Sequence, residues 1–90
     1  MPEQPRAENL LNFPCDHLFK AMGPNSVIFI EKVRRAVAET VPIAEDAVKT
    51  RASTKGNYLS VTVRVHLENF DQLTRIYASL RKIDELKFLL

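Results

Sequence analysis

The stretch from Lys55 to Leu67, KGNYLSVTVRVHL, constrains the fold of this chain more than any other. Side chains on a strand point alternately to its two faces, so a period of two indicates a strand with one buried and one polar face. The alternating apolar residues of this stretch are Leu59, Val61, Val63, Val65 and Leu67. We therefore predict a long central strand. Gly56 and Asn57 readily accept positive φ and predict a tight turn from a preceding strand.

The residues before this strand predict a first strand, a helix and an edge strand. Residues 15–22 alternate, with Phe19 and Ala21 expected in the core and Leu18, Lys20 and Met22 on the other face. Asn25 or Ser26 is expected to cap a helix over residues 27–40, which carries apolar residues at helical spacing and ends at Pro42. Residues 43–47 are a predicted connection. Residues 48–53 form a predicted strand that carries Lys49 and Arg51 on one face. We place it at the edge of the sheet, where charged side chains discourage pairing with a second molecule.

The residues after the central strand predict a second helix and a last strand. Asn69 followed by Gln72 resembles a capping box, and an apolar stripe continues to Arg81 or Lys82. The last strand is expected at 86–90, with its alternate residues facing two sides. We expect Leu86, Phe88 and Leu90 to point inward, and Lys87 and Leu89 to point outward.

The predicted order βαββαβ is that of a ferredoxin-like α+β fold. Right-handed crossovers place both helices on one face of a four-stranded antiparallel sheet in the order 4-1-3-2. The other face is left uncovered, and we expect function there. Residues 13–90 form a single predicted domain, and residues 1–12, with two prolines, a predicted flexible tail.

Composition narrows the classes of function. A chain of 90 residues has a modest core and little room for a deep pocket, so a buried ligand site is expected between two copies, as in a homodimer. The single cysteine, Cys15, demands no oxidising compartment, which makes the cytoplasm the expected location. We expect neither a signal peptide nor a membrane segment, because no apolar run reaches the required length.

The uncovered face is predicted to be basic, although the formal net charge is only +2. Lys20, Arg64 and Lys87 fall on it, whereas acidic residues concentrate on the helices and loops. Such segregation favours an anionic metabolite or an acidic protein surface as the partner. The alternative is that these Lys and Arg side chains only keep the uncovered sheet soluble and bind no partner.

No catalytic or metal-binding constellation stands out. His17 and His66 lack metal-ligand spacing to other donors, and no nucleophile pairs with a base, so we predict no enzyme, no metal and no cofactor. The stretch KGNYLSVTV invites comparison with the third-strand motif of RNA-recognition modules. Of the outward aromatic residues that stack on bases in those modules, only Tyr58 is present, which disfavours nucleic acid as a partner.

Three segments, FPCDHLFKAMG (13–23), STKGNYLSVTV (53–63) and KIDELKFLL (82–90), resemble the YbeD-like family of small bacterial proteins. The resemblance implies an ACT-like fold and a regulatory or ligand-sensing role, with an association to lipoate metabolism through gene neighbourhood. It brings no catalytic residues. The positions that match its motifs are Lys20, Met22, Gly23, Lys55, Gly56, Asn57 and Tyr58.

Two hypotheses follow. The first is a non-catalytic ACT-like module that pairs through sheet or helix edges and binds a small anionic metabolite or a partner protein. In it Lys20, Arg64 and Lys87 supply charge, and the turn from Lys55 to Tyr58 supplies backbone donors. The alternative is a nucleic-acid-binding domain that uses the basic face.

Overall fold

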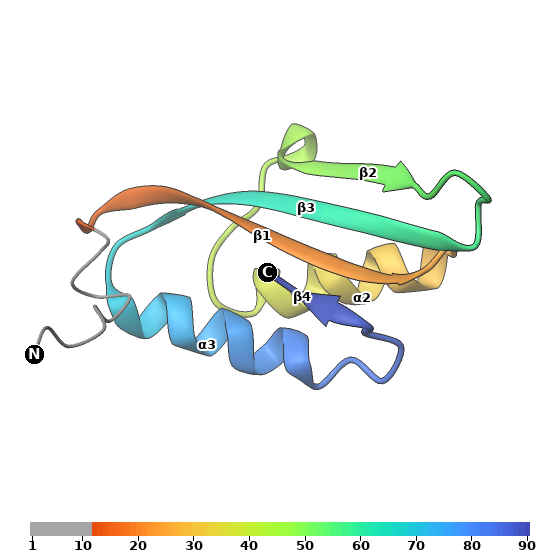
Figure 1. Cartoon of the computed structure of the whole chain (residues 1–90). Coiled ribbons are helices and arrows are strands. Elements are labelled where there is room, and N and C mark those ends of the chain that lie inside the picture. The colour runs from red at the N-terminus through yellow and green to blue at the C-terminus, as the bar shows by residue number, and fades with distance from the viewer. Residues whose placement is uncertain (1–11) are drawn as a thin grey trace, which may run out of the picture.

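The computed structural model describes residues 12–90, which form a four-stranded antiparallel sheet with two helices on one face (Figure 1). The elements are β1 (Cys15–Pro24), α2 (Val27–Ala38), the 3-10 turn η1 (Glu45–Ala47), β2 (Val48–Ala52), β3 (Tyr58–Leu67), α3 (Phe70–Arg81) and β4 (Phe88–Leu89). The strand order β2-β3-β1-β4 is the predicted order 4-1-3-2 taken from the opposite edge. The predicted ferredoxin-like fold is confirmed. The predicted tail lies, except for Asn12, outside the described residues.

The two long central strands supply most of the sheet side of the core. β1 and β3 pair over their full lengths, from Cys15 opposite Leu67 to Pro24 opposite Tyr58. In this register Phe19 faces Val63 and Ala21 faces Val61, and all four side chains are buried. The alternation seen in the sequence therefore marks the core face correctly on both strands.

The helices cover this face through their apolar stripes. Ser26 is the N-cap of α2, because its Oγ accepts a hydrogen bond of 3.1 Å from the backbone N–H of Phe29. Asn69 caps α3 in the same way, accepting from the N–H of Gln72 at 2.9 Å. The helix residues that are buried against the sheet are Phe29, Val33, Ala36, Val37, Leu73, Ile76 and Leu80.

The last strand differs from the prediction. β4 contains only Phe88 and Leu89, and its pairing places Phe88 opposite Met22 and Leu89 opposite the buried Ala21. Leu89 therefore packs against the core, whereas Phe88 and Leu90 are 67% and 66% exposed. The predicted facing of these three residues was wrong, because pairing with β1 fixes the facing of this short strand.

β2 lies at the edge of the sheet and extends past the helix layer (Figure 1). Thr50 and Ala52 are paired with the buried Val61 and Leu59, so they face the helix side of the sheet. Both are nevertheless exposed. This strand therefore contributes little to the core.

Burial predicts the cost of truncating an apolar side chain. Ile76→Ala removes a fully buried side chain of α3 (0% exposed) and should lower the free energy of unfolding by about 2–5 kcal/mol. Ile28→Ala, on the exposed side of α2 (64% exposed), is the matched control and should change it by less than about 0.5 kcal/mol. Urea denaturation followed by circular dichroism measures both values. Equal losses for the two variants would contradict this assignment of the core.

Candidate functional site

The side of the sheet without helices, which we call the open face, carries a mixture of cationic and apolar side chains. β1 contributes Leu18, Lys20 and Met22, and β2 contributes Lys49 and Arg51, whose strand partners Thr62 and Ser60 lie on the same face. Tyr58 begins β3, and Phe88 and Leu90 come from the end of the chain. Three strands and the end of a fourth thus meet in one surface.

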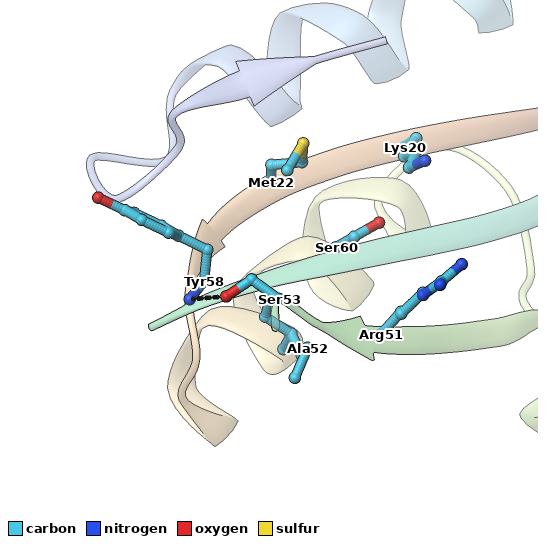
Figure 2. A pocket seen from close by; sticks show the side chains of 8 residues that line it. Lys20, Met22, Arg51, Ala52, Ser53, Tyr58 and Ser60 are labelled. Atoms are coloured by element: carbon cyan, nitrogen blue, oxygen red, sulfur yellow. Dashed lines mark hydrogen bonds between the residues drawn. The ribbon is translucent and has the colours of Figure 1, made fainter. Parts of the chain in front are cut away.

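A shallow hollow of about 230 Å³ lies on the open face where β1, β2 and β3 run side by side. Figure 2 shows the basic groups of Lys20 and Arg51 on opposite sides of the β3 strand at Ser60. Met22 and Tyr58 form its apolar end. Ser53 Oγ accepts a hydrogen bond of 3.2 Å from the N–H of Tyr58, which ties the end of β2 to the start of β3 (Figure 2).

The apolar end of this hollow continues onto β4. Met22, Tyr58, Lys87 and Phe88 line a smaller hollow of about 180 Å³. The backbone N–H of Lys87 donates to Met22 O at 2.7 Å, so the connection before β4 is fixed against β1. Of the predicted site residues, the structure thus brings Lys20, Met22, Tyr58 and Lys87 to one end of the open face.

Arg64 lies elsewhere on the open face, in a cluster with acidic residues. Its Nη2 is 3.2 Å from Asp16 Oδ2, and the other carboxylate oxygen of Asp16 is 3.0 Å from His66 Nδ1. His66 Nε2 is 3.1 Å from Glu68 Oε2. Asp16 compensates Arg64, so the cations that β1 and β2 place on the open face without a carboxylate partner within residues 12–90 are Lys20, Lys49 and Arg51. The predicted basic face did not account for Asp16.

The cluster shifts the titration of two exposed groups. Hydrogen bonds from His66 and then Arg64 lower the pKa of Asp16. The hydrogen bond to Asp16, together with the charge of Glu68, raises the pKa of His66. By contrast, burial lowers the pKa of His17, whose Nε2 is 3.4 Å from the hydroxyl of Tyr77. These contacts join β1 to β3 and β1 to α3. Asp16, Arg64 and His66 also line an open hollow of about 300 Å³ beside the residues that precede β2.

Among the remaining motif residues, the two glycines have structural roles. Gly56 has φ of +77°, which suits a glycine, and its carbonyl oxygen accepts a hydrogen bond of 2.9 Å from the side-chain amide of Asn25. Lys55 and Asn57 are exposed in the same turn and do not line the hollow. Gly23 is buried beneath the ring of Phe29, because a Cβ built on it would lie 2.5 Å from the ring.

Residues 12–90 contain no group of three or more His, Cys, Asp or Glu side chains arranged to hold a metal ion. Within the same residues, no helix is long and apolar enough to cross a membrane.

An open antiparallel sheet backed by two helices, with a shallow basic and apolar surface, defines a small α+β protein of the ferredoxin-like class. Residues 8–90 match the family described as "Protein of unknown function (DUF493)", and the chain belongs to this family. The resemblance to the YbeD-like proteins is thereby confirmed, and the match supplies no catalytic residues.

Relatives of similar length come from several bacteria. A UPF0250 protein of Neisseria gonorrhoeae is 39% identical over the full length of both chains. Another, from Idiomarina loihiensis, is 31% identical over 98% of this chain and 99% of its own. The solution structure of protein HP0495 from H. pylori superposes with a TM-score of 0.68, covering 100% of this chain and 94% of that one. At 14% identity, that similarity shows the shared fold.

The contact between Gly23 and Phe29 predicts a packing role at this motif position. Gly23→Ala places a methyl group against the ring and should lower the free energy of unfolding by about 1–3 kcal/mol. Gly56→Ala is the comparison, because its Cβ would meet nothing within 4 Å and only the positive φ opposes it, at about 1–2 kcal/mol. Thermal denaturation monitored by circular dichroism measures both. A Gly23→Ala protein as stable as wild type would contradict this assignment.

The pKa values of the two histidines should differ from the ordinary value in opposite directions, upward for His66 and downward for His17. Because its pKa is raised, His66 stabilises the fold when protonated. This contribution is present below its ordinary pKa and is lost as pH rises through the raised value. His17 should titrate below its ordinary pKa. NMR of the imidazole protons across a pH series measures both values. Asp16→Asn should return the pKa of His66 toward its ordinary value and leave the pKa of His17 unchanged. If Asp16→Asn does not change the pKa of His66, the cluster of Asp16 and His66 is contradicted.

Proposed function

We propose that this chain is a non-catalytic protein-interaction module that binds an acidic partner protein on its open face. The observation that supports this proposal is the hollow with Lys20 and Arg51 beside Met22 and Tyr58. Within residues 12–90 neither cation has a carboxylate partner, whereas Arg64 and Lys32 do. Unpaired cations beside exposed apolar side chains suit a surface that both attracts an acidic partner and buries apolar area.

The shape of the hollow favours a protein over a small metabolite. Sites for small molecules usually enclose about 300–1,000 Å³ and bury most of the ligand. The hollow here measures about 230 Å³ and lies on the exposed face of the sheet. Exposed aromatic and aliphatic side chains around it supply the apolar anchors typical of protein interfaces. Tyr58 is 49% and Phe88 67% exposed.

The regulatory role and the homodimer remain predictions that this proposal includes. Because the YbeD-like resemblance associates the family with lipoate metabolism, acidic proteins of that metabolism are the first partners to test. Light scattering during size-exclusion chromatography determines whether two copies pair, and so whether one or two open faces are available to a partner.

Charge reversal in the hollow tests the proposal. Wild-type protein immobilised on beads should retain acidic proteins from a bacterial lysate, and mass spectrometry would identify them. Lys20→Glu combined with Arg51→Glu should weaken binding of the identified partner by about tenfold or more, measured by calorimetry with purified proteins. Arg35→Glu combined with Lys82→Glu, two exposed cations on the helix side, is the matched control and should leave the affinity unchanged. Equal losses for both double variants would contradict a site on the open face.

Nucleic acid is a second candidate because of Phe88, which joins Tyr58 as an exposed aromatic residue of the open face. Aromatic side chains on such a sheet can stack on unpaired bases. A single-stranded RNA oligonucleotide should then bind with an affinity that falls steeply with salt, and Phe88→Ala should weaken it. Tight RNA binding with no acidic protein partner would replace the first proposal by this one.

A further inference from the structure

The outer edge of β2 offers backbone hydrogen-bonding groups to another strand. β2 ends the sheet, and its only strand partner among the described residues is β3. The N–H of Ser53 donates to Tyr58 O at 2.8 Å, which makes these two residues a hydrogen-bonded pair of the ladder. Such pairs alternate along antiparallel strands, so Lys49 and Arg51 direct their backbone groups to β3. Val48, Thr50 and Ala52 therefore direct theirs outward.

The side chains of β2 limit what can pair with this edge. A strand added there would place alternate residues directly opposite Lys49 and Arg51 on the open face. These side chains have no carboxylate partner within residues 12–90. An acidic residue in each of the two opposing positions would pair with them, whereas a basic residue would be repelled.

A second copy of β2 does not satisfy this requirement. Antiparallel registers that align the outward-facing residues of two β2 strands place Lys49 opposite Lys49, Lys49 opposite Arg51, or Arg51 opposite Arg51. Like charges directly opposite each other destabilise the pair. Nor does the chain supply a suitable acidic strand, because no two of its Asp and Glu residues are separated by one position.

We infer that β2 accepts an extended segment of the acidic partner protein as an additional strand, with two acidic side chains one residue apart facing Lys49 and Arg51. This inference rests on the proposed function, because it names the form in which the acidic partner binds. Backbone hydrogen bonds to Val48, Thr50 and Ala52 supply affinity, and the charge pairs set the register, as in other cases of strand addition. The helix side of β2 leaves room for the added strand, because Thr50 and Ala52 are exposed there.

Short peptides test this inference on the whole chain. The probe is a fluorescein-labelled peptide of Thr and Val with two Glu residues separated by one position, and its isomer has the two Glu residues adjacent. Fluorescence anisotropy should show binding of the first peptide about tenfold or more tighter than binding of the isomer. N-methylation of a peptide amide that faces β2 should weaken binding by about tenfold, and N-methylation of the next amide should not. Equal binding of all four peptides would show charge attraction alone and overturn the inference, as would no binding up to ~1 mM.

Two variants of the protein separate strand addition from the proposed function. Thr50→Pro removes an outward N–H without removing a hydrogen bond to β3, so it should weaken binding of the first peptide by about tenfold. Circular dichroism checks that this variant is folded. Lys49→Glu combined with Arg51→Glu should transfer the preference to a peptide with Lys in place of Glu. If Lys20→Glu weakens binding of a purified acidic partner while Thr50→Pro does not, strand addition is overturned and the proposed function stands. If neither variant weakens binding of the partner, strand addition and the proposed function are both overturned.

Discussion

The pairing of β1 with β3 is the interaction on which the rest of this structure depends. The two strands are in register from Cys15 opposite Leu67 to Pro24 opposite Tyr58, so each fixes which residues of the other face the core. Both helices pack on the side that this register makes apolar, and β2 and β4 only extend the pair at its two edges. A shift of one residue would expose Phe19 and bury Lys20, which explains why the alternation is strict here.

Much of the fold could be predicted because the long elements carry redundant local signals. The central strand alternates over its whole length, and Ser26 and Asn69 mark the helix starts by chemistry that requires no distant partner. β4 has no such redundancy. Phe88, Leu89 and Leu90 are all apolar, so hydrophobicity does not distinguish the two faces of this strand. Hydrogen bonds between Lys20 and Leu90 of 3.1 and 2.8 Å set its facing. Hydrophobicity alone therefore gave the wrong face.

The surface was harder to predict than the core because its charges are paired by distant residues. Lys20, Met22 and Tyr58 could be placed on the open face from alternation alone, and the structure brings them into one hollow. Asp16 lies 48 residues from Arg64 in sequence, so only the register of β1 and β3 reveals that it compensates this cation. Gly23 illustrates the opposite case, in which a motif residue serves packing under Phe29. A motif position is thus no measure of function without its neighbours.

The placement of β2 beyond the helix layer also divides the molecule into regions of unequal local stability. Four of the five residues of β2 are exposed, so we expect local separation of this strand from β3 to cost much less free energy than unfolding the core. Its amide protons should then exchange with solvent far faster than those of β1, which is hydrogen-bonded at the centre of the sheet. An edge strand that opens locally can adjust its backbone to a bound segment while Phe19, Phe29 and Ile76 stay packed in the core. Recognition and folding would thus depend on separate parts of one small sheet.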